Sequence, residues 1–249
     1  MSGADRGPAR RSAGADLRHV DTWLFDLDNT LYPPEAEILA LVEGRMTDFV
    51  AREIGLPLEE ARVLQKRYWQ EHGTTLAGLM ANHGIDPEAF LDEVHDVSLE
   101  RLSPDPALRA GLERLPGRRL VFTNGDAGHA ERILAKLGVD DLFEDTFHIG
   151  SAGFIPKPDP RCFALMVQAH TVRAETAAFF EDAARNLAPA AALGMTTVLV
   201  GAHAAEDASD FVHHRTADLA DFLHSVRINE PAHPCAGGDP GVRTPLRGG

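Results

Sequence analysis

Cysteine is scarce in this chain, with only Cys162 and Cys235 among 249 residues. Two cysteines cannot build a disulfide framework, and no Cys-x-x-Cys pair or Cys/His spacing of a zinc site is present. The apolar helical pattern around Cys162 predicts a core residue, whereas Cys235 lies in a segment rich in Gly and Pro. Disulfide-stapled secreted domains and zinc modules are therefore excluded.

Long apolar runs and an excess of positive charge are also lacking. No segment approaches the roughly 18 apolar residues that a membrane-spanning helix requires. Residues 1–19 contain several arginines but no apolar stretch of a secretion signal, so we expect a soluble, cytoplasmic protein. The net charge is −14. Because such an acidic surface repels nucleic acids and anionic membranes, neither is an expected partner.

Short apolar runs alternate with helical patterns through most of the chain. The runs are continuous enough for parallel strands covered on both faces, and strands alternating with helices predict an α/β fold with a Rossmann-like, doubly wound parallel sheet. Residues 20–33 and 116–228 would form this core, and residues 1–19 and 229–249 would be disordered tails. The predicted strands are Thr22–Asp26, Leu120–Thr123, Asp145–Ile149, Ala177–Glu181 and Thr196–Val200.

Residues 34–115 depart from this alternation. They contain only helical patterns, including an apolar face at Ala61, Leu64 and Tyr68. Because this segment is inserted after the first strand, we expect an all-helical cap domain above the carboxyl ends of the strands, where open α/β sheets bind ligands.

Two carboxylates follow the first predicted strand, Asp26 and Asp28. One carboxylate can attack a phosphoryl group while the other transfers protons to and from the leaving oxygen. An acidic turn without catalytic function explains this pair equally well when it is considered alone.

Later strand ends also carry polar residues of useful kinds. Thr123 and Asn124 precede a helix start, whose N–H groups bind anions. Lys157 is held between two prolines, which suits a fixed cation facing phosphate. Glu181 and Asp182 offer the oxygen ligands that Mg²⁺ prefers. Each feature alone is also explained by a common turn, a solvent-facing lysine or a helix N-cap.

The order of these motifs resembles the haloacid dehalogenase (HAD) superfamily, over roughly Asp21 to Val200. The motifs are the Asp-x-Asp-x-Thr run at Asp26, then Thr123, Lys157 and the Glu181-Asp182 pair. The Asp-Asn-Thr-Leu-Tyr-Pro run that begins at Asp28, and the stretch from His72 to Leu79, are similar to the pyrimidine 5′-nucleotidase branch.

This resemblance implies a role for each matching residue. Asp26 would be the nucleophile, and Asp28 the acid/base and a metal ligand through its backbone carbonyl. Thr123, Asn124 and Lys157 would hold the phosphoryl oxygens. Asp26, Asp28 and Asp182, with Glu181 directly or through water, would form the Mg²⁺ site. The dehalogenase branch lacks the second aspartate, so Asp28 argues against that activity.

The resemblance thus implies a Mg²⁺-dependent phosphatase for a small phosphorylated metabolite, a nucleoside monophosphate such as UMP or CMP. A phosphatase for phosphoglycolate or a sugar phosphate, a phosphomutase and a non-catalytic phosphate-binding module remain alternatives. Among the histidines, His129 either approaches the cleft or is solvated, and His213 and His214 are expected in a surface loop. The cap residues considered for recognising the leaving group are Arg45, Tyr68, His72, Thr74 and Thr75.

Overall fold

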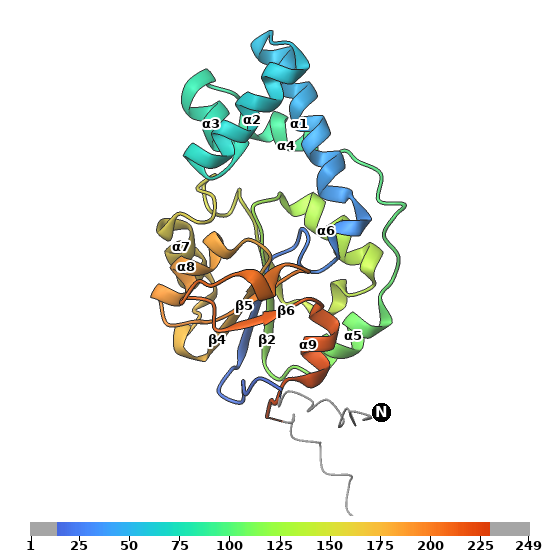
Figure 1. Ribbon diagram of the computed structural model, residues 1–249, viewed down its shortest axis with the longest axis vertical. Helices are drawn as coiled ribbons and strands as arrows, with labels where there is room; N and C mark the ends of the chain where they lie inside the picture. The colour runs from blue at the N-terminus through green and yellow to red at the C-terminus, as the bar shows by residue number, and fades with distance from the viewer. Residues whose placement is uncertain (1–13, 230–249) are drawn as a thin grey trace, which may run out of the picture.

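The computed structural model describes residues 14–229, and in this part of the chain six strands form one parallel sheet (Figure 1). The strand order is β3-β2-β1-β4-β5-β6, which confirms the predicted doubly wound α/β fold. The strands are β1 (Thr22–Phe25), β2 (Arg118–Phe122), β3 (Asp145–Phe147), β4 (Ala177–Glu181), β5 (Thr196–Val200) and β6 (His214–Thr216).

Strand β1 lies at the centre of the sheet, between β2 and β4. Its last residue, Phe25, is in register with Val121 of β2 and Phe180 of β4. From β1 the chain builds the sheet outward in both directions, which makes the carboxyl end of β1 the topological switch point where such sheets bind ligands. Asp26 follows Phe25 directly and therefore lies at this point.

Helices cover both faces of the sheet, because its strands are apolar on both sides. Phe25 and Phe180 stack at 4.7 Å on one face, while Leu24 and Phe179 belong to a second buried cluster on the other. The first face packs against α5 (Pro106–Glu113), α6 (Ala127–Leu137) and α9 (Leu219–Ser225). The second packs against α7 (Pro160–His170) and α8 (Ala184–Ala192).

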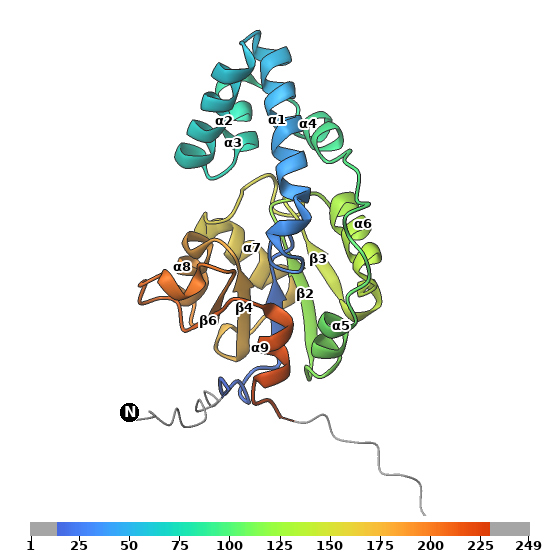
Figure 2. The ribbon, with the colours of Figure 1, turned by 45° about the vertical axis from the view of Figure 1, so that its right-hand side comes forward.

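Four cap helices stand above the carboxyl ends of the strands (Figures 1 and 2). They enclose an apolar core of their own, which includes Phe49, Leu64, Tyr68 and Phe90. The helices are α1 (Ile38–Ile54), α2 (Leu58–His72), α3 (Thr75–His83) and α4 (Pro87–Val94).

Helix α5 differs from the expectation for residues 34–115. It packs closely on α9, because a Cβ added to Gly111 would lie only 2.9 Å from Cβ of Leu223. Its Leu108 and Leu112 belong to the core cluster on the first face of the sheet. Because the apolar side chains of α5 pack in the core, α5 belongs to the core, and the cap consists of α1 to α4. Four 3-10 turns complete the described elements: η1 (Pro34–Ala36), η2 (Asp140–Leu142), η3 (Ala174–Thr176) and η4 (Ala204–Glu206).

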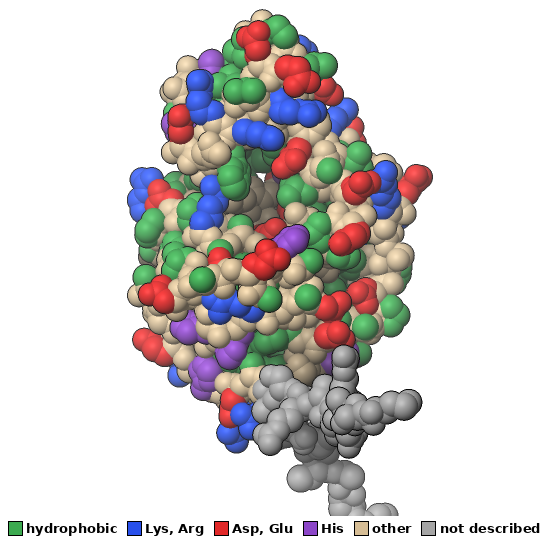
Figure 3. Space-filling model, viewed as in Figure 1, with side chains coloured by type: hydrophobic (Ala, Val, Ile, Leu, Met, Phe, Trp, Pro, Cys, Tyr) green, Lys and Arg blue, Asp and Glu red, His purple; other side chains and the backbone are tan. Residues whose placement is uncertain are grey.

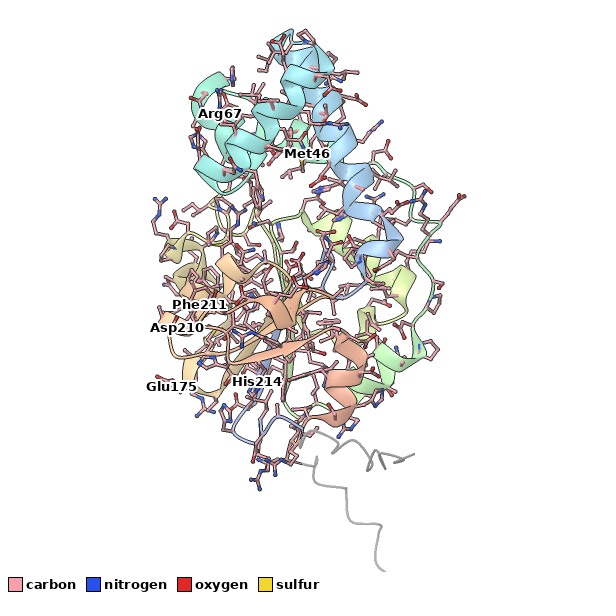
Figure 4. The ribbon with its side chains drawn as sticks, in the orientation of Figure 1. Met46, Arg67, Glu175, Asp210, Phe211 and His214 are labelled. Carbon is pink, nitrogen blue, oxygen red and sulfur yellow. The ribbon has the colours of Figure 1, made fainter. Side chains whose placement is uncertain are left out.

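Two other expectations need correction. Asp16 pairs with Arg227 and Leu17 is 1% exposed, so residues 14–19 are not a disordered tail, because Leu17 packs into the core. His214, expected in a surface loop, begins the edge strand β6 and is labelled in Figure 4.

The rest of the predicted tails, residues 1–13 and 230–249 with Cys235, lies outside the described residues. Cys162 is buried as expected. Between residues 14 and 229, no helix is long and apolar enough to cross a bilayer.

Candidate active site

The chemically useful side chains of the strand ends meet in one cavity of about 430 Å³ between the sheet and the cap. Figure 3 shows the surface hollowed between these two parts of the molecule. Parallel strands end at the same edge of the sheet, and this geometry brings together residues from distant parts of the sequence. The cavity is lined on its floor by Asp26, Asp28, Thr123, Asn124, Lys157, Glu181 and Asp182.

Lys157 is at the centre of the floor and is only 1% exposed. Its Nζ donates to Oδ1 of Asp26 at 2.6 Å, to Oε2 of Glu181 at 2.7 Å and to the carbonyl of Phe122 at 2.8 Å. Burial opposes the charge of this amine, but the two carboxylates outweigh it and raise the pKa of Lys157. Lys157 is therefore a fixed cation.

The backbone of Lys157 is held by Asn124, which follows β2. The Asn124 amide donates to the Lys157 carbonyl at 3.2 Å, and its Oδ1 accepts from the Lys157 N–H at 2.8 Å. Thr123 is buried beside it, and its Oγ1 accepts from the Gly125 N–H at 2.9 Å. The Asn124 side chain thus positions the lysine, while the phosphate contacts expected for Thr123, Asn124 and Lys157 stay a prediction.

Asp26 is a buried carboxyl in an unfavourable environment for its charge. Burial, together with the nearby charge of Glu181, raises the pKa of Asp26 to about 7 in spite of Lys157. Its Oδ2 accepts a hydrogen bond from the Thr30 hydroxyl at 3.2 Å. Asp26 thus has few polar partners besides Lys157 and remains available for chemistry.

Asp28 has the opposite environment. Burial opposes its ionisation, but His129 and the Tyr32 hydroxyl outweigh this and lower its pKa. Both groups reach the same oxygen, Oδ1: the Tyr32 hydroxyl donates at 2.5 Å, and Nε2 of His129 lies at 2.9 Å. His129 is buried and lines the cavity, so of the two alternatives, cleft or solvent, the structure has the cleft. The two aspartates therefore suit different roles.

Three of the floor carboxylates could hold a metal ion. Asp26, Glu181 and Asp182 each offer an oxygen, and these atoms lie within 4.8 Å of one another. Burial raises the pKa of Glu181 to about 7 and that of Asp182 to about 6, the latter helped by the charge of Asp26. Crowded carboxylates with raised pKa values and only oxygen donors fit a hard divalent cation such as Mg²⁺. The backbone carbonyl of Asp28 stays a predicted ligand.

The cap side of the cavity differs from the expectation. Thr74 and Thr75 line it, but the Thr74 hydroxyl caps α3 and that of Thr75 bonds to the Gln65 carbonyl at 3.4 Å. Arg45, Tyr68 and His72 do not line it.

These three side chains are engaged within the cap instead. Arg45 donates to the Glu93 carbonyl at the end of α4, and His72 lies beside Asn82. The Tyr68 hydroxyl lies 2.7 Å from Nε2 of His83, because Tyr68 is on the face of α2 that fills the cap core.

Other residues form the roof of the cavity. Trp69 lies one position beyond Tyr68, on the other face of α2, and Met46 of α1, labelled in Figure 4, lines the same space. Arg185 rises from the first turn of α8, which follows Asp182, and its guanidinium lies 3.6 Å from the Trp69 ring centre. It also donates to the carbonyls of Trp69 at 3.2 Å and Gly73 at 3.0 Å. The position of Arg185 after a strand end was the only signal for it in the sequence.

Comparisons with known proteins agree with this geometry. Residues 20–194 match the model of a protein family described as "haloacid dehalogenase-like hydrolase". Phosphate metabolism protein 8 of Saccharomyces cerevisiae is 32% identical over 201 residues, which are 74% of this chain and 62% of that protein. The chain therefore spans less than two thirds of that relative's length.

Solved structures share the fold at low identity. The HAD phosphatase from Thermococcus onnurineus has a TM-score of 0.57 and 19% identity, over 84% of this chain and all of that one. The L-2-haloacid dehalogenase from Xanthobacter autotrophicus has a TM-score of 0.51 and 18% identity, over 82% of this chain and 97% of that one. The family match covers most of the chain, including β1, the cap and β4, so this protein belongs to the haloacid dehalogenase-like hydrolases.

Proposed function

We propose that this hydrolase is a Mg²⁺-dependent phosphomonoesterase that works through an aspartyl-phosphate on Asp26. The observation that carries the proposal is the pair of aspartates at the switch point of the sheet. Asp26 lies against a buried cation, Lys157, whereas Asp28 is held by Tyr32 and His129. Two carboxyls with such different partners suit a nucleophile and a proton carrier.

In the first step, an oxygen of Asp26 attacks phosphorus and the bond between phosphorus and the ester oxygen breaks. Asp28 gives a proton to that oxygen as it leaves. Although the pKa of Asp28 is lowered in the resting site, the negative charge of an arriving phosphate raises it and favours the protonated form.

In the second step, Asp28 takes a proton from water, and the resulting hydroxide attacks the phosphorus of the aspartyl-phosphate. The bond to Asp26 breaks and phosphate leaves. The proton that Asp28 gains replaces the one that it gave to the leaving oxygen, so both aspartates return to their starting states. The lowered pKa of Asp28 suits this base step.

Charge repulsion explains why the floor needs cations. Two unit charges about 4 Å apart interact with roughly 4 kcal/mol at an effective dielectric of about 20, so a carboxylate and a phosphate dianion repel strongly. Lys157 offsets part of this repulsion. Asp26, Glu181 and Asp182 would hold Mg²⁺, which when bound would stabilise the ionised Asp26 and the charge on the phosphoryl oxygens.

For the substrate we propose a pyrimidine nucleoside monophosphate such as UMP or CMP. A cavity of about 430 Å³ is within the size range of sites for ligands larger than phosphoglycolate. Its roof combines an aromatic ring, Trp69, with the amide side chain of Gln70, whereas the Gln65 amide bonds within the cap to Thr47 and to the Glu43 carbonyl. An aromatic face and an amide group suit a nucleobase, which stacks and forms hydrogen bonds.

Phosphate release from a panel of phosphomonoesters tests both levels of the proposal. UMP and CMP should give higher kcat/KM than AMP, phosphoglycolate or glucose phosphates, because the cap distinguishes leaving groups while the floor performs the same transfer on each. Equal or better turnover of phosphoglycolate would contradict the nucleotide assignment alone. A protein that binds these esters but releases no phosphate would be a binding module, and the phosphatase proposal would be wrong.

A further inference from the structure

His129 contacts Asp28, the aspartate to which the proposed function, on which this inference rests, assigns proton transfer. His129 is 1% exposed, and its Nε2 lies 2.9 Å from Oδ1 of Asp28. A carboxylate can only accept hydrogen bonds, so Nε2 carries the hydrogen and donates it. Tyr32 donates to the same oxygen at 2.5 Å. Oδ1 therefore has two donors.

The other oxygen of Asp28, Oδ2, lies near the turn after β2, where the sequence predicts phosphate contacts. A Cβ added to Gly125 would lie 3.8 Å from Oδ2 of Asp28 and 3.3 Å from both Oγ1 of Thr123 and Cδ2 of His129. Oδ2 is thus beside the turn that follows β2, whereas Oδ1 is bound to Tyr32 and His129. This arrangement leaves Oδ2 as the oxygen that exchanges protons with substrate and water.

The ring of His129 is itself held by a residue of the cap. His95, which follows α4, stacks on His129 with ring centres 4.3 Å apart and an angle of 16° between the planes. Nδ1 of His129 has no hydrogen-bond partner within residues 14–229, so the stacking and Asp28 fix the orientation of this ring.

One carboxylate, Asp126, anchors both histidines. Its Oδ1 accepts from the His129 backbone N–H at 2.8 Å as the N-cap of α6, and its Oδ2 bonds to Nδ1 of His95. Arg132 of α6 also donates to the His95 carbonyl. A continuous series of contacts therefore connects the cap, through His95 and His129, to Asp28.

We propose that His129 is a positioning residue that fixes the Asp28 carboxylate with Oδ2 toward the reacting phosphoryl group, and that His95 transmits the position of the cap to it. His129 exchanges no proton with the substrate in this scheme. Its effect is to keep the acid/base in the productive orientation when the cap is seated on the core.

The test compares two leaving groups. kcat/KM reports the steps up to aspartyl-phosphate formation, in which an alkyl ester needs a proton from Asp28 and an aryl ester needs little. With UMP, or the alkyl ester of the panel that is hydrolysed fastest, His129→Phe should lower kcat/KM about 100-fold, because a misplacement of about 1 Å can cost that much. With p-nitrophenyl phosphate, kcat/KM should fall less than about 5-fold while kcat falls more, since water activation also requires Asp28.

Matched variants separate positioning from packing. His129→Gln retains a donor near the position of Nε2 and should restore much of the alkyl-ester rate. Tyr32→Phe removes the second donor with little change of shape and should shift the alkyl/aryl ratio in the same direction. His95→Phe keeps a ring for stacking but loses the bond to Asp126, and we expect a smaller shift of the same sign. His203→Phe, at a side chain that is 87% exposed, is the control.

Each outcome bears on one claim. Equal losses with both esters in His129→Phe and Tyr32→Phe, with unchanged thermal stability, would overturn the positioning role. His129→Phe added to Asp28→Asn should cost little further alkyl-ester activity, because the residue that it positions is already disabled; full additivity would also overturn it. If Asp28→Asn leaves the alkyl/aryl ratio unchanged, the proposed acid/base function itself fails, whatever His129 does.

Discussion

The floor and the roof of the cavity are built differently. The floor has charged groups held in place by burial: Lys157 bonds to Asp26 and Glu181, and all three are almost fully enclosed. The roof mixes apolar side chains such as Val42, Met46 and Phe90 with polar ones, and Trp69 remains 48% exposed. A rigid charged floor suits phosphoryl transfer, which depends on placement and electrostatics. A more open roof suits discrimination between leaving groups.

Hydrogen bonds join the two parts at two bridges beside the cavity, and Ile149 of the core also packs into the cap cluster. Arg185 of α8 reaches up to Trp69 and Gly73 of the cap, and His95 of the cap reaches down to Asp126. The hydrogen bonds of Arg185 reach residues of the roof alone, whereas the His95 bridge continues through His129 to Asp28 in the floor. We therefore expect changes at the first bridge to affect substrate binding and changes at the second to affect the chemistry.

Asp26→Asn should have the largest effect, because it removes the nucleophile from the floor with almost no change of shape. We expect turnover to fall to background with alkyl and aryl esters alike, and no phosphorylated protein to form. Steady-state phosphate release and intact-mass spectrometry check this. Turnover comparable to wild type would show that the floor is not organised around Asp26.

The three carboxyls of the floor that we propose as metal ligands are expected to respond to pH. A carboxyl group whose pKa is higher in the folded state than in the unfolded state favours folding while it is protonated. This stabilisation is complete below the unfolded-state pKa, near 4, and is lost as pH rises through the folded-state pKa. For Asp26 and Glu181 that value is about 7, and for Asp182 about 6. Without metal these groups therefore weaken the fold between about pH 4 and 7. Mg²⁺ binds the ionised forms, so its stabilising effect should grow over this interval.

Thermal unfolding with and without Mg²⁺ at pH 5 and pH 8, at constant ionic strength, measures this effect. Mg²⁺ should raise Tm little at pH 5 and substantially at pH 8. Asp182→Asn should reduce this Mg²⁺-dependent increase and should lose most of the activity. Ca²⁺ should replace Mg²⁺ poorly in activity, since it prefers more ligands and a looser geometry. Full activity in excess EDTA, or the same Tm increase at both pH values, would argue against the metal site.

Arg185→Lys should have an intermediate effect confined to the roof. Lysine keeps the charge but loses the planar group that stacks on Trp69 and donates to two carbonyls. A hydrogen bond from a charged group is worth about 1.5–3 kcal/mol, so we expect kcat/KM for UMP to fall about 10-fold. Most of the loss should be in KM, and p-nitrophenyl phosphate should be affected little. An equal loss of kcat with both esters would place Arg185 in the chemistry instead.

Tyr68→Phe and Arg45→Lys should have the smallest effects on activity. Both side chains bond within the cap, to His83 and to the Glu93 carbonyl, and neither lines the cavity. We expect the relative kcat/KM values across the panel to stay as in wild type, with a slight loss of thermal stability. A changed preference among nucleotides would mean that the recognising face of the cap has been misassigned.

The floor could be predicted from the sequence because its geometry follows from the sheet. Once Asp26, Thr123 and Glu181 are placed at the ends of parallel strands, their proximity needs no further information. The edge strand β6 was missed because it has only three residues, all partly exposed, and lacks the apolar run that marks the buried strands.

The roof could not be predicted in the same way. On a helix, neighbouring residues point in different directions, and without knowing how α2 meets the core the sequence could not distinguish Tyr68 from Trp69 as the residue facing the cavity. The apolar pattern of Ala61, Leu64 and Tyr68 identified one face of α2 but not whether that face meets the cap core or the cavity; in the structure all three lie in the cap core. The role of His95 could not be predicted from the sequence, because its contact with Asp126 depends on how the cap sits on the core.

The central claim is that Asp26 carries the phosphoryl group and Asp28 moves the protons, and trapping the intermediate tests it most directly. Asp28→Asn keeps the nucleophile but lacks the base for the second step, so incubation with p-nitrophenyl phosphate should leave phosphate bound to the protein. Acid quenching, reduction of the acyl-phosphate with borohydride and peptide mass spectrometry then locate it. We predict modification of Asp26 alone. Phosphate on another residue, or rapid turnover with no phosphorylated protein, would contradict the account.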